Sequence, residues 1–324
     1  MHNKLGGILL RRGDLEGALG QYEESMKIKA TDTGTITDLG TVLLRMGRTD
    51  EAIREYEEAL KLNPRYAESH NNLGSALVKT GRVKEGMDEY VLALDLDPDD
   101  ASAHDNLGSA MMLAGRVPDA MKQFEIALRL NPDDSETLSN MGNALAQQGR
   151  FSEAIEEFRA ALKIDPGLAE VHNRMGGALQ QAGQMEDAAE QYVEALKIKP
   201  DYAEAHLNLG IALSRMGIYP EAEEQIRAAL KLLPDNPVAL TSLGNVFLRS
   251  GKFPEAMAQY REALKRDPDF AEAHNNLGAA LEQEGRPAQA AAEYREALRI
   301  NPNDQEAQEN LARVEAKKKA APSR

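Results

Sequence analysis

The sequence predicts an all-α fold, a solenoid of stacked helical hairpins, because three features return every 34 residues. One is a glycine that follows Leu or Met, at Gly6, Gly40, Gly74, Gly108, Gly142, Gly176, Gly210, Gly244 and Gly278. Another is a glycine seven residues later, at Gly13, Gly47, Gly81, Gly115, Gly149, Gly183, Gly217, Gly251 and Gly285. The last is a proline, at Pro64, Pro98, Pro132, Pro166, Pro200, Pro234, Pro268 and Pro302. One period kept by three columns over nearly the whole chain defines the structural unit.

Each unit is expected to hold two helices. Glu204 follows Asp201 by three residues, a capping-box pattern that predicts a helix start at Asp201. Apolar or small residues then recur at helical spacing until Gly217, and a second such stripe runs to Pro234, which cannot continue a helix. The glycines and alanines of both stripes allow the two helices to approach closely. The Thr-rich start of the second unit contains Gly34 and predicts a frayed helix.

Two further columns suggest a known family. An alanine column reads Ala52, Ala120, Ala154, Ala188, Ala222, Ala256 and Ala290, with Gly86 as its exception. An aromatic column reads Tyr22, Tyr56, Tyr90, Phe124, Phe158, Tyr192, Tyr260 and Tyr294, with Ile226 as its exception. Together with the Gly and Pro columns, this pattern resembles the tetratricopeptide repeat. The resemblance implies a right-handed superhelical α-solenoid of helix-turn-helix repeats, whose first helices line a concave groove that holds a partner protein or peptide.

The resemblance divides residues 1–304 into nine repeats. Their approximate bounds are 1–32, 33–66, 67–100, 101–134, 135–168, 169–202, 203–236, 237–270 and 271–304. A lone helix at 305–319 is expected to cap the array, because Glu315 stands where earlier repeats carry leucine and gives the last element a polar outer face. Residues 320–324 are expected to form a disordered tail.

Composition and charge limit the function. The formal net charge of −15 argues against nucleic-acid phosphates as the main partner. Cysteine is absent, which excludes thiolate metal sites. No apolar run approaches the roughly 18 residues of a membrane span, so membrane insertion is not expected. Arg11 and Arg12 follow the short apolar stretch near the start, the wrong order for a secretory signal, so a cytoplasmic location is favoured.

No group of residues suggests a catalytic site, a cofactor or a metal. The six histidines share one repeat position, at His2, His70, His104, His172, His206 and His274. Neighbouring first helices pack about 8–10 Å apart, whereas zinc ligands lie about 2 Å from their ion, so no two of these rings can share a metal. We expect the rings to pack between helices. If they are buried in the neutral form, acidification should lower stability.

The residue two before each glycine of the first column is expected to face the groove. It is asparagine at six of its ten positions, Asn72, Asn106, Asn140, Asn208, Asn276 and Asn310. Asparagine costs a helix up to about 0.7 kcal/mol relative to alanine, so a compensating role is expected. Its amide both donates and accepts, and it can hold a peptide backbone without reading the peptide's side chains. The alternatives are that these amides hydrogen-bond to one another along the inner helices, or that they are simply solvated.

Further amides are expected in the groove close to this column, at Asn71, Asn143, Asn173, Asn245 and Asn275. The stretch "AEAHNNLG" is also similar to repeats of the O-linked N-acetylglucosamine transferases. That similarity implies an asparagine ladder that grips an extended substrate along the superhelix axis.

Other groove positions vary between repeats. Apolar residues there are candidate anchor pockets, unless they serve only to pack neighbouring first helices: Val78, Met112, Leu113, Leu207, Ile211, Val238 and Leu248. Glutamates at helix starts predict an acidic edge: Glu68, Glu136, Glu170, Glu204 and Glu272. Basic residues near helix ends predict a basic edge: Arg45, Lys79, Arg215 and Arg249. Both edges also suit the helix dipole, which is the simpler interpretation.

Some members of the family bind acidic chaperone C-termini through a two-carboxylate clamp. Arg174 could fill one position of such a clamp, but Glu170 stands where a lysine is needed and the rest of the set is missing. That class of partner is therefore not expected.

The sequence thus predicts a non-catalytic protein–protein interaction scaffold that binds an extended peptide or a partner protein in its groove. One alternative is the substrate-recruiting region of a larger enzyme, such as a glycosyltransferase. Another is a homo-oligomer formed through the N-terminal end, where Leu5, Ile8 and Leu9 are expected to be exposed because no helix precedes them.

Overall fold

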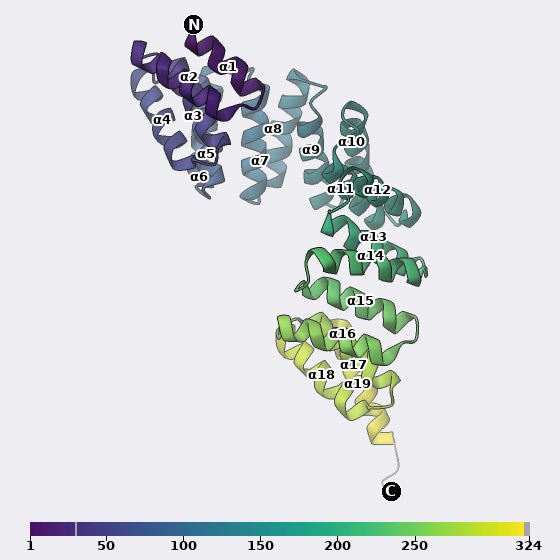
Figure 1. Ribbon diagram of the computed structural model, residues 1–324. Coiled ribbons are helices and arrows are strands. Elements are labelled where there is room, and N and C mark those ends of the chain that lie inside the picture. Colours follow the sequence, from purple (N-terminus) through teal and green to yellow (C-terminus); the bar gives the residue numbers. More distant parts are fainter. Residues whose placement is uncertain (30, 321–324) are drawn as a thin grey trace. The chain divides into compact units, whose positions relative to one another are not determined.

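The computed structural model describes residues 1–29 and 31–320, with side chains up to residue 317 (Figure 1). Within these residues the chain forms nineteen helices and no strand. The predicted all-α repeat solenoid is therefore confirmed. The chain divides into two compact units, Met1–Pro166 (unit 1) and Gly167–Arg324 (unit 2), and each is described by itself. No helix in the described part is both long enough and apolar enough to cross a bilayer.

The helices have nearly constant lengths. In the described residues, unit 1 holds α1 (His2–Arg11), α2 (Leu15–Ile28), α3 (Thr33–Arg45), α4 (Thr49–Leu62), α5 (Ala67–Lys79), α6 (Val83–Leu96), α7 (Ala101–Leu113), α8 (Val117–Leu130), α9 (Ser135–Gln147) and α10 (Phe151–Ile164). Unit 2 holds α11 (Ala169–Gln181), α12 (Met185–Ile198), α13 (Ala203–Arg215), α14 (Tyr219–Leu232), α15 (Pro237–Arg249), α16 (Phe253–Arg266), α17 (Ala271–Gln283), α18 (Pro287–Ile300) and α19 (Gln305–Ala320). The rest of the predicted tail, residues 321–324, lies outside the described residues.

The helices of each unit form two layers. Each odd-numbered helix packs against the even-numbered helix that follows it, as α5 does against α6 and α15 against α16. The odd-numbered, or first, helices also contact one another from repeat to repeat, as α3 contacts α5 and α13 contacts α15. In the described residues, the even-numbered, or second, helices contact only first helices. Side chains at one repeat position on successive first helices are therefore neighbours across a continuous layer.

The second glycine column makes the turn inside each hairpin. Its nine members have φ between 73° and 84°, in the left-handed region that side chains with a Cβ rarely adopt. Gly81, for example, reverses the chain between the end of α5 and the start of α6. The backbone of the turn requires this column.

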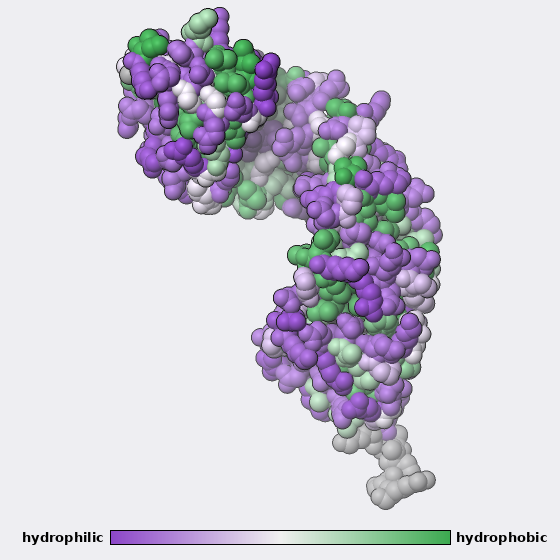
Figure 2. All heavy atoms as spheres, in the orientation of Figure 1, coloured by the Kyte–Doolittle hydropathy of each residue, from purple (hydrophilic) through white to green (hydrophobic). Residues whose placement is uncertain are grey.

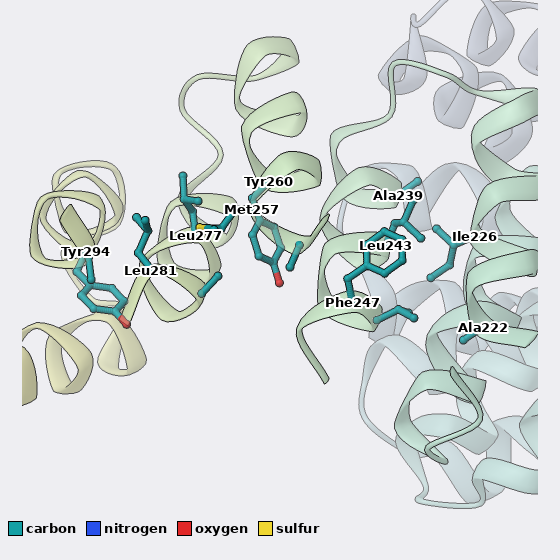
Figure 3. Packing of buried hydrophobic residues seen from close by; sticks show 14 of the residues in the cluster. Ala222, Ile226, Ala239, Leu243, Phe247, Met257, Tyr260, Leu277, Leu281 and Tyr294 are labelled. Atoms are coloured by element: carbon teal, nitrogen blue, oxygen red, sulfur yellow. The ribbon is translucent and has the colours of Figure 1, made fainter. Parts of the chain in front are cut away.

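The first glycine column gives room to the aromatic column of the same hairpin. A Cβ built on Gly40 would lie 2.6 Å from Cε1 of Tyr56, whose side chain is completely buried. Ile226 replaces the aromatic residue opposite Gly210, and its Cγ1 would lie 2.5 Å from a Cβ built there. Figure 3 shows Ile226 and Tyr260 in one buried cluster that continues through successive helices. The core therefore depends on a glycine-to-ring contact repeated along the array.

The one exception in the alanine column has a steric explanation. A Cβ built on Gly86 in α6 would lie 2.5 Å from Cγ2 of Val78 and 2.8 Å from the carbonyl oxygen of Gly74, both in α5. Val78 thus occupies the space that an alanine methyl fills in other hairpins, and α5 and α6 approach too closely for a methyl group.

Two predicted helix starts need correction. Helix α13 begins at Ala203 and follows Tyr202 without a side-chain cap, so the capping box predicted at Asp201 is wrong. Helix α3 begins at Thr33 and includes Gly34, and its start is capped because the Asp32 carboxylate accepts a hydrogen bond from the Thr35 backbone N–H at 3.3 Å. The expectation of a weak start overlooked this cap.

Four histidines, His70, His104, His206 and His274, join their first helix to its partner helix and to the loop before it. Nδ1 of His274 donates to Oε2 of Glu293 at 2.7 Å, and Nε2 donates to the carbonyl oxygen of Pro268 at 3.1 Å. The same pair of contacts is formed by His70 with Glu89 and Pro64. At His274, the hydrogen bond to Glu293 raises the pKa of the ring and so favours the imidazolium. For His274, the predicted loss of stability on acidification therefore has the wrong sign.

The terminal helices differ in how they are covered. In α19, Ala307 and Val314 are buried, and Glu315 forms an ion pair with Arg295 of α18 at 2.6 Å. In α1, Leu5 and Ile8 are exposed as predicted, at 43% and 41%. Leu9 packs against the core of unit 1 instead, which corrects the third expected position. Hydrophilic side chains cover most of the face seen in Figure 2, with smaller hydrophobic areas between them.

Candidate peptide-binding groove

The asparagine column forms a ladder of hydrogen bonds between first helices. Nδ2 of each ladder residue donates to the first helix of the preceding repeat. In unit 1 the pairs are Asn72 to Thr41 Oγ1 (3.4 Å), Asn106 to Asn71 Oδ1 (3.0 Å) and Asn140 to Asp105 Oδ1 (3.1 Å). In unit 2 they are Asn208 to Asn173 Oδ1, Asn276 to Asn245 Oδ1 and Asn310 to Asn275 Oδ1, each at 3.0 Å. The hydrogen bonds along the inner helices, which the sequence left open as an alternative, are present.

The side chains of the ladder differ in exposure. The acceptors Asn71, Asn173 and Asn275 are buried, at 9%, 2% and 3% exposure. Asn173 also donates through Nδ2 to Glu204 Oε1 at 3.0 Å. Of the donors, Asn310 is buried as well, and the other five are half-buried. The structure thus places Asn71, Asn173, Asn275 and Asn310 in the packing between first helices, whereas the acceptor Asn245 and the other donor amides lie at the edge of that packing.

Tyrosines of the second helices support the same layer from behind. The hydroxyl groups of Tyr56, Tyr90 and Tyr260 pass the first-helix glycine and donate to Thr41 Oγ1 (3.2 Å), Ser75 Oγ (3.0 Å) and Asn245 Oδ1 (2.8 Å). Burial raises the pKa of Tyr56 to about 12, so its hydroxyl remains a donor at neutral pH. Thr41, Ser75 and Asn245 share one position of the 34-residue repeat. The sequence did not reveal this column of hydrogen-bond acceptors, because the residue type changes from repeat to repeat.

Unit 2 contains a groove of about 690 Å³ on its first-helix layer. It is lined by Ile211, Ser214, Arg215, Val238, Ser242, Asn245, Leu248, Arg249, Ala271, Glu272, Asn275, Asn276, Asn301, Asp304 and Glu306. Its volume falls in the usual range of ligand sites, about 300–1,000 Å³. The structure therefore brings together nine residues predicted for the groove and its edges: Asn245, Asn275, Asn276, Arg215, Arg249, Ile211, Val238, Leu248 and Glu272.

Asn245 and Asn276 present one free donor and one free acceptor in this groove. Oδ1 of Asn245 accepts from both Tyr260 and Asn276, which fixes the orientation of its amide and leaves Nδ2 unused. Asn276 uses its Nδ2 in that bond, and its Oδ1 has no hydrogen-bond partner in the part of the chain that the structure describes. Among the described residues, the buried side-chain atoms without a hydrogen-bond partner are Gln180 Oε1 and Thr241 Oγ1. Asn245 Nδ2 and Asn276 Oδ1 are not among these buried atoms, so both reach solvent. A peptide group needs this combination of one donor and one acceptor.

The charges of the groove lie at two edges. Arg215 and Arg249, both exposed, end helices α13 and α15. Glu272 and Glu306, also exposed, lie in the first turns of α17 and α19. In the described part of the chain, none of these four side chains takes part in an ion pair within 4.0 Å.

The remaining predicted residues lie outside this groove. Lys79, Met112, Leu113 and Asn143 belong to unit 1; Leu113 is 69% exposed, and the ammonium of Lys79 donates to the carbonyl oxygen of Leu44. Arg174 belongs to α11 and lies 3.7 Å from the Glu170 carboxylate. Asn72, Asn106, Asn140, Asn208 and Asn310 take part in the ladder away from the groove.

Sequence reasoning missed several residues that line the groove. Ser214 and Ser242 were not singled out, because serine in a helix carries little information, although Ser242 shares the repeat position of the ladder asparagines. Glu306 follows Glu272 by 34 residues and could have been found by extending the acidic column into the last helix. Asn301 and Asp304 come from the loop before α19, which lies outside the predicted groove helices.

Comparison with known proteins identifies the repeat. Residues 37–101 match the family described as tetratricopeptide repeat. Residues 134–323, more than half of the chain, match the family described as cilia and flagella-associated protein 70 C-terminal domain, a tetratricopeptide-type domain. No curated protein matches the sequence. The similarity to glycosyltransferase repeats stays a prediction.

Solved structures show the same fold at low sequence identity. A chain in the crystal structure of the APC/C hetero-tetramer Cut9–Hcn1 has a TM-score of 0.64 and 17% identity, over 94% of this chain and 59% of that one. The present chain thus spans about three fifths of that relative's length. A tetratricopeptide repeat protein from Parabacteroides merdae has a TM-score of 0.62 and 17% identity, over 77% of this chain and 98% of that one. The repeated columns, the two-layer hairpins and these matches together show that the chain belongs to the tetratricopeptide repeat family.

Proposed function

We propose that this chain is a protein–protein interaction scaffold whose unit 2 groove binds an extended segment of a partner protein. Membership of the tetratricopeptide repeat family supports the scaffold role, since this repeat is generally a non-catalytic interaction module. The observation that carries the peptide-binding part is the pair of unused amide atoms, Asn245 Nδ2 and Asn276 Oδ1, in a groove of about 690 Å³.

The hydrogen-bonded ladder gives this pair a fixed geometry. Asn245 is held by two donors, and Asn275 of the same groove accepts from Asn310 of α19. A site that is held in place before binding loses less conformational entropy when the ligand arrives. Apolar contact is available from Val238, which is 44% exposed beside these amides. The groove can therefore grip backbone through amides and one or two side chains through apolar contact.

A selection from a random peptide library on the full chain tests the proposal. Val238→Trp should fill the groove and abolish binding of the enriched peptides, because the side chain is exposed and the substitution need not disturb the core. Val193→Trp is the matched control, since Val193 is 39% exposed on the second helix α12, outside the groove. Peptides that bind both tryptophan variants equally well would place the site elsewhere.

A second variant examines the amide itself. Asn245→Asp keeps an oxygen that can accept from Tyr260 and Asn276 but removes the Nδ2 donor. Unit 1 contains such an arrangement, because Asp105 accepts from the ladder residue Asn140. The variant should remain folded and bind selected peptides about fivefold to tenfold more weakly, as expected for one lost hydrogen bond. Unchanged affinity would mean that this amide does not contact the ligand.

A further inference from the structure

The groove of unit 2 crosses the first-helix layer diagonally. On α13 it is lined only by the C-terminal half, from Ile211 to Arg215. On α15 it is lined along the whole length of the helix, from Val238 to Arg249. On α17 and α19 only the N-terminal turns contribute. A segment in the groove therefore runs from the C-terminal ends of α13 and α15 to the N-terminal ends of α17 and α19.

The two ends of this path carry opposite charge. Arg215 and Arg249 form the first end, and Glu272 and Glu306 form the second. The helix dipole alone does not account for the arginines, because Gln181 and Gln283 occupy the same repeat position in α11 and α17. In unit 1, Arg45 and Lys79 at this position donate to backbone carbonyl groups of the preceding first helix. No such bond is formed by Arg215 or Arg249 in the described residues, so their guanidinium groups are available to a ligand.

We propose that the groove selects a bipolar polypeptide segment, with acidic side chains at the arginine end, basic side chains at the glutamate end and an aliphatic side chain between them. The proposal rests on the peptide-binding function above and adds the chemistry of the partner. Charge complementarity sets the two ends. Ile211, Val238 and Leu248 line the path between them and supply the apolar contact.

The expected segment is short. The path crosses two to three steps between neighbouring first helices, each about 8–10 Å. An extended chain rises about 3.3 Å per residue, so roughly five to nine residues span the distance. Because an extended peptide could run in either direction, the proposal fixes the separation of the charges and leaves the order along the partner chain to the test.

Five peptides of equal length, in four compositions, test the proposal by fluorescence anisotropy with the full chain at low ionic strength. All share a central leucine; their flanks are acidic on one side and basic on the other, acidic on both, basic on both, or glutamine on both. The bipolar peptide is made in both orders. The better bipolar order should bind about threefold to tenfold more tightly than the three other compositions.

Charge reversal at each end separates the two contributions. Arg215→Glu with Arg249→Glu should move the preference to the peptide that is basic on both sides. Glu272→Lys with Glu306→Lys should move it to the peptide that is acidic on both sides. The matched control is Arg159→Glu with Arg261→Glu, two exposed arginines of second helices, which changes the net charge by the same amount and should leave the preference unchanged.

The outcomes distinguish charge selection by the groove from peptide binding by the groove. If all peptides bind the wild type equally and Asn245→Asp weakens all of them, peptide binding stands and the charge selection is overturned. The charge selection is also overturned if the control pair shifts the preference as much as the groove pairs. If none of the peptides binds and the library selection enriches none, the peptide-binding function itself fails.

Discussion

At the scale of single residues, the two helices of a hairpin can approach closely only if one of them has no side chain at the contact. In the hairpin α5–α6, a methyl group of Val78 fills the space next to Gly86, which has no side chain. Other hairpins have alanine at the position of Gly86. The pattern of the family would suggest that alanine is also the better residue here. Packing at this contact argues the reverse, because cores tolerate extra methyl groups poorly.

Gly86→Ala should therefore destabilise the protein, although alanine improves helix propensity by about 1 kcal/mol. Overpacking against Val78 and the Gly74 carbonyl costs about 1–3 kcal/mol and outweighs that gain. The penalty should shrink in a Val78→Ala background, as measured by urea unfolding in a double-mutant cycle. Gly20→Ala is the control, because nothing lies within 4 Å of a Cβ at Gly20 in α2, and that change should stabilise. Equal penalties in both backgrounds would contradict the packing explanation.

His274 should make stability depend on pH in the direction opposite to that of a histidine buried in the neutral form. Its pKa is raised above the ordinary value of 6.5 by the hydrogen bond to Glu293, so its stabilisation is fully present below pH 6.5. That stabilisation is lost as the pH rises through the folded-state pKa. Glu293→Gln should remove this pH dependence, so the difference in unfolding free energy between wild type and variant should shrink between pH 5.5 and 8.5. A difference that stays constant over this range would show that the ring does not titrate against Glu293.

At the scale of elements, helix α19 is held by a largely buried carboxylate, that of Glu282, as well as by apolar packing. Glu282 of α17 accepts from Arg313 at 2.9 Å and from Lys317 at 3.0 Å, both on α19. The Arg313 hydrogen bond, together with Lys317, lowers the pKa of Glu282 to about 2. The Glu282 side chain is only 13% exposed, whereas Arg313 and Lys317 are 48% and 66% exposed, so solvent screens these ion pairs in part.

Acid should therefore loosen α19 before it affects the other helices. The contribution of Glu282 is present above its unfolded pKa of 4.5 and is lost as the pH falls from there to about 2; it amounts to at most about 3 kcal/mol. In acid, the backbone amides of α19 should exchange hydrogen faster than those of the other helices. In Glu282→Gln, the same fast exchange should appear already at neutral pH. Glu315→Gln, which breaks a more exposed pair with Arg295, should have a much smaller effect. Comparable effects of the two variants would rule out the special role of Glu282.

The elements show what periodicity can predict and what it cannot. The helices, their turns and the glycine-to-ring contacts follow from columns that each repeat enforces, so they could be read from the sequence. The start of α13 could not, because Asp201 and Glu204 match a cap pattern while the loop geometry leaves Tyr202 before the helix. The burial of Asn71, Asn173 and Asn275 also escaped prediction, because it depends on how neighbouring first helices contact each other.

At the scale of the whole molecule, stability is expected to be a sum of local terms. The described chain divides into two compact units, and within each unit a hairpin contacts the hairpins next to it. In such arrays, a destabilising substitution lowers the stability of the neighbouring repeats most, and its effect decreases with distance along the chain. A compact domain with a single core behaves differently, because one core truncation there accelerates every amide that exchanges by global unfolding.

Two truncations at equivalent positions separate these cases. Phe124→Ala in α8 and Tyr260→Ala in α16 each remove a fully buried ring, a change that typically costs about 3–5 kcal/mol. Hydrogen exchange should accelerate about a hundredfold or more in α7–α9 for the first variant and in α15–α17 for the second, with the other unit unchanged. The second variant should also weaken peptide binding, because the Tyr260 hydroxyl orients Asn245, whereas the first should not. Uniform acceleration across both units in either variant would show that the array unfolds as one body, and the groove could then not be altered independently of the rest of the scaffold.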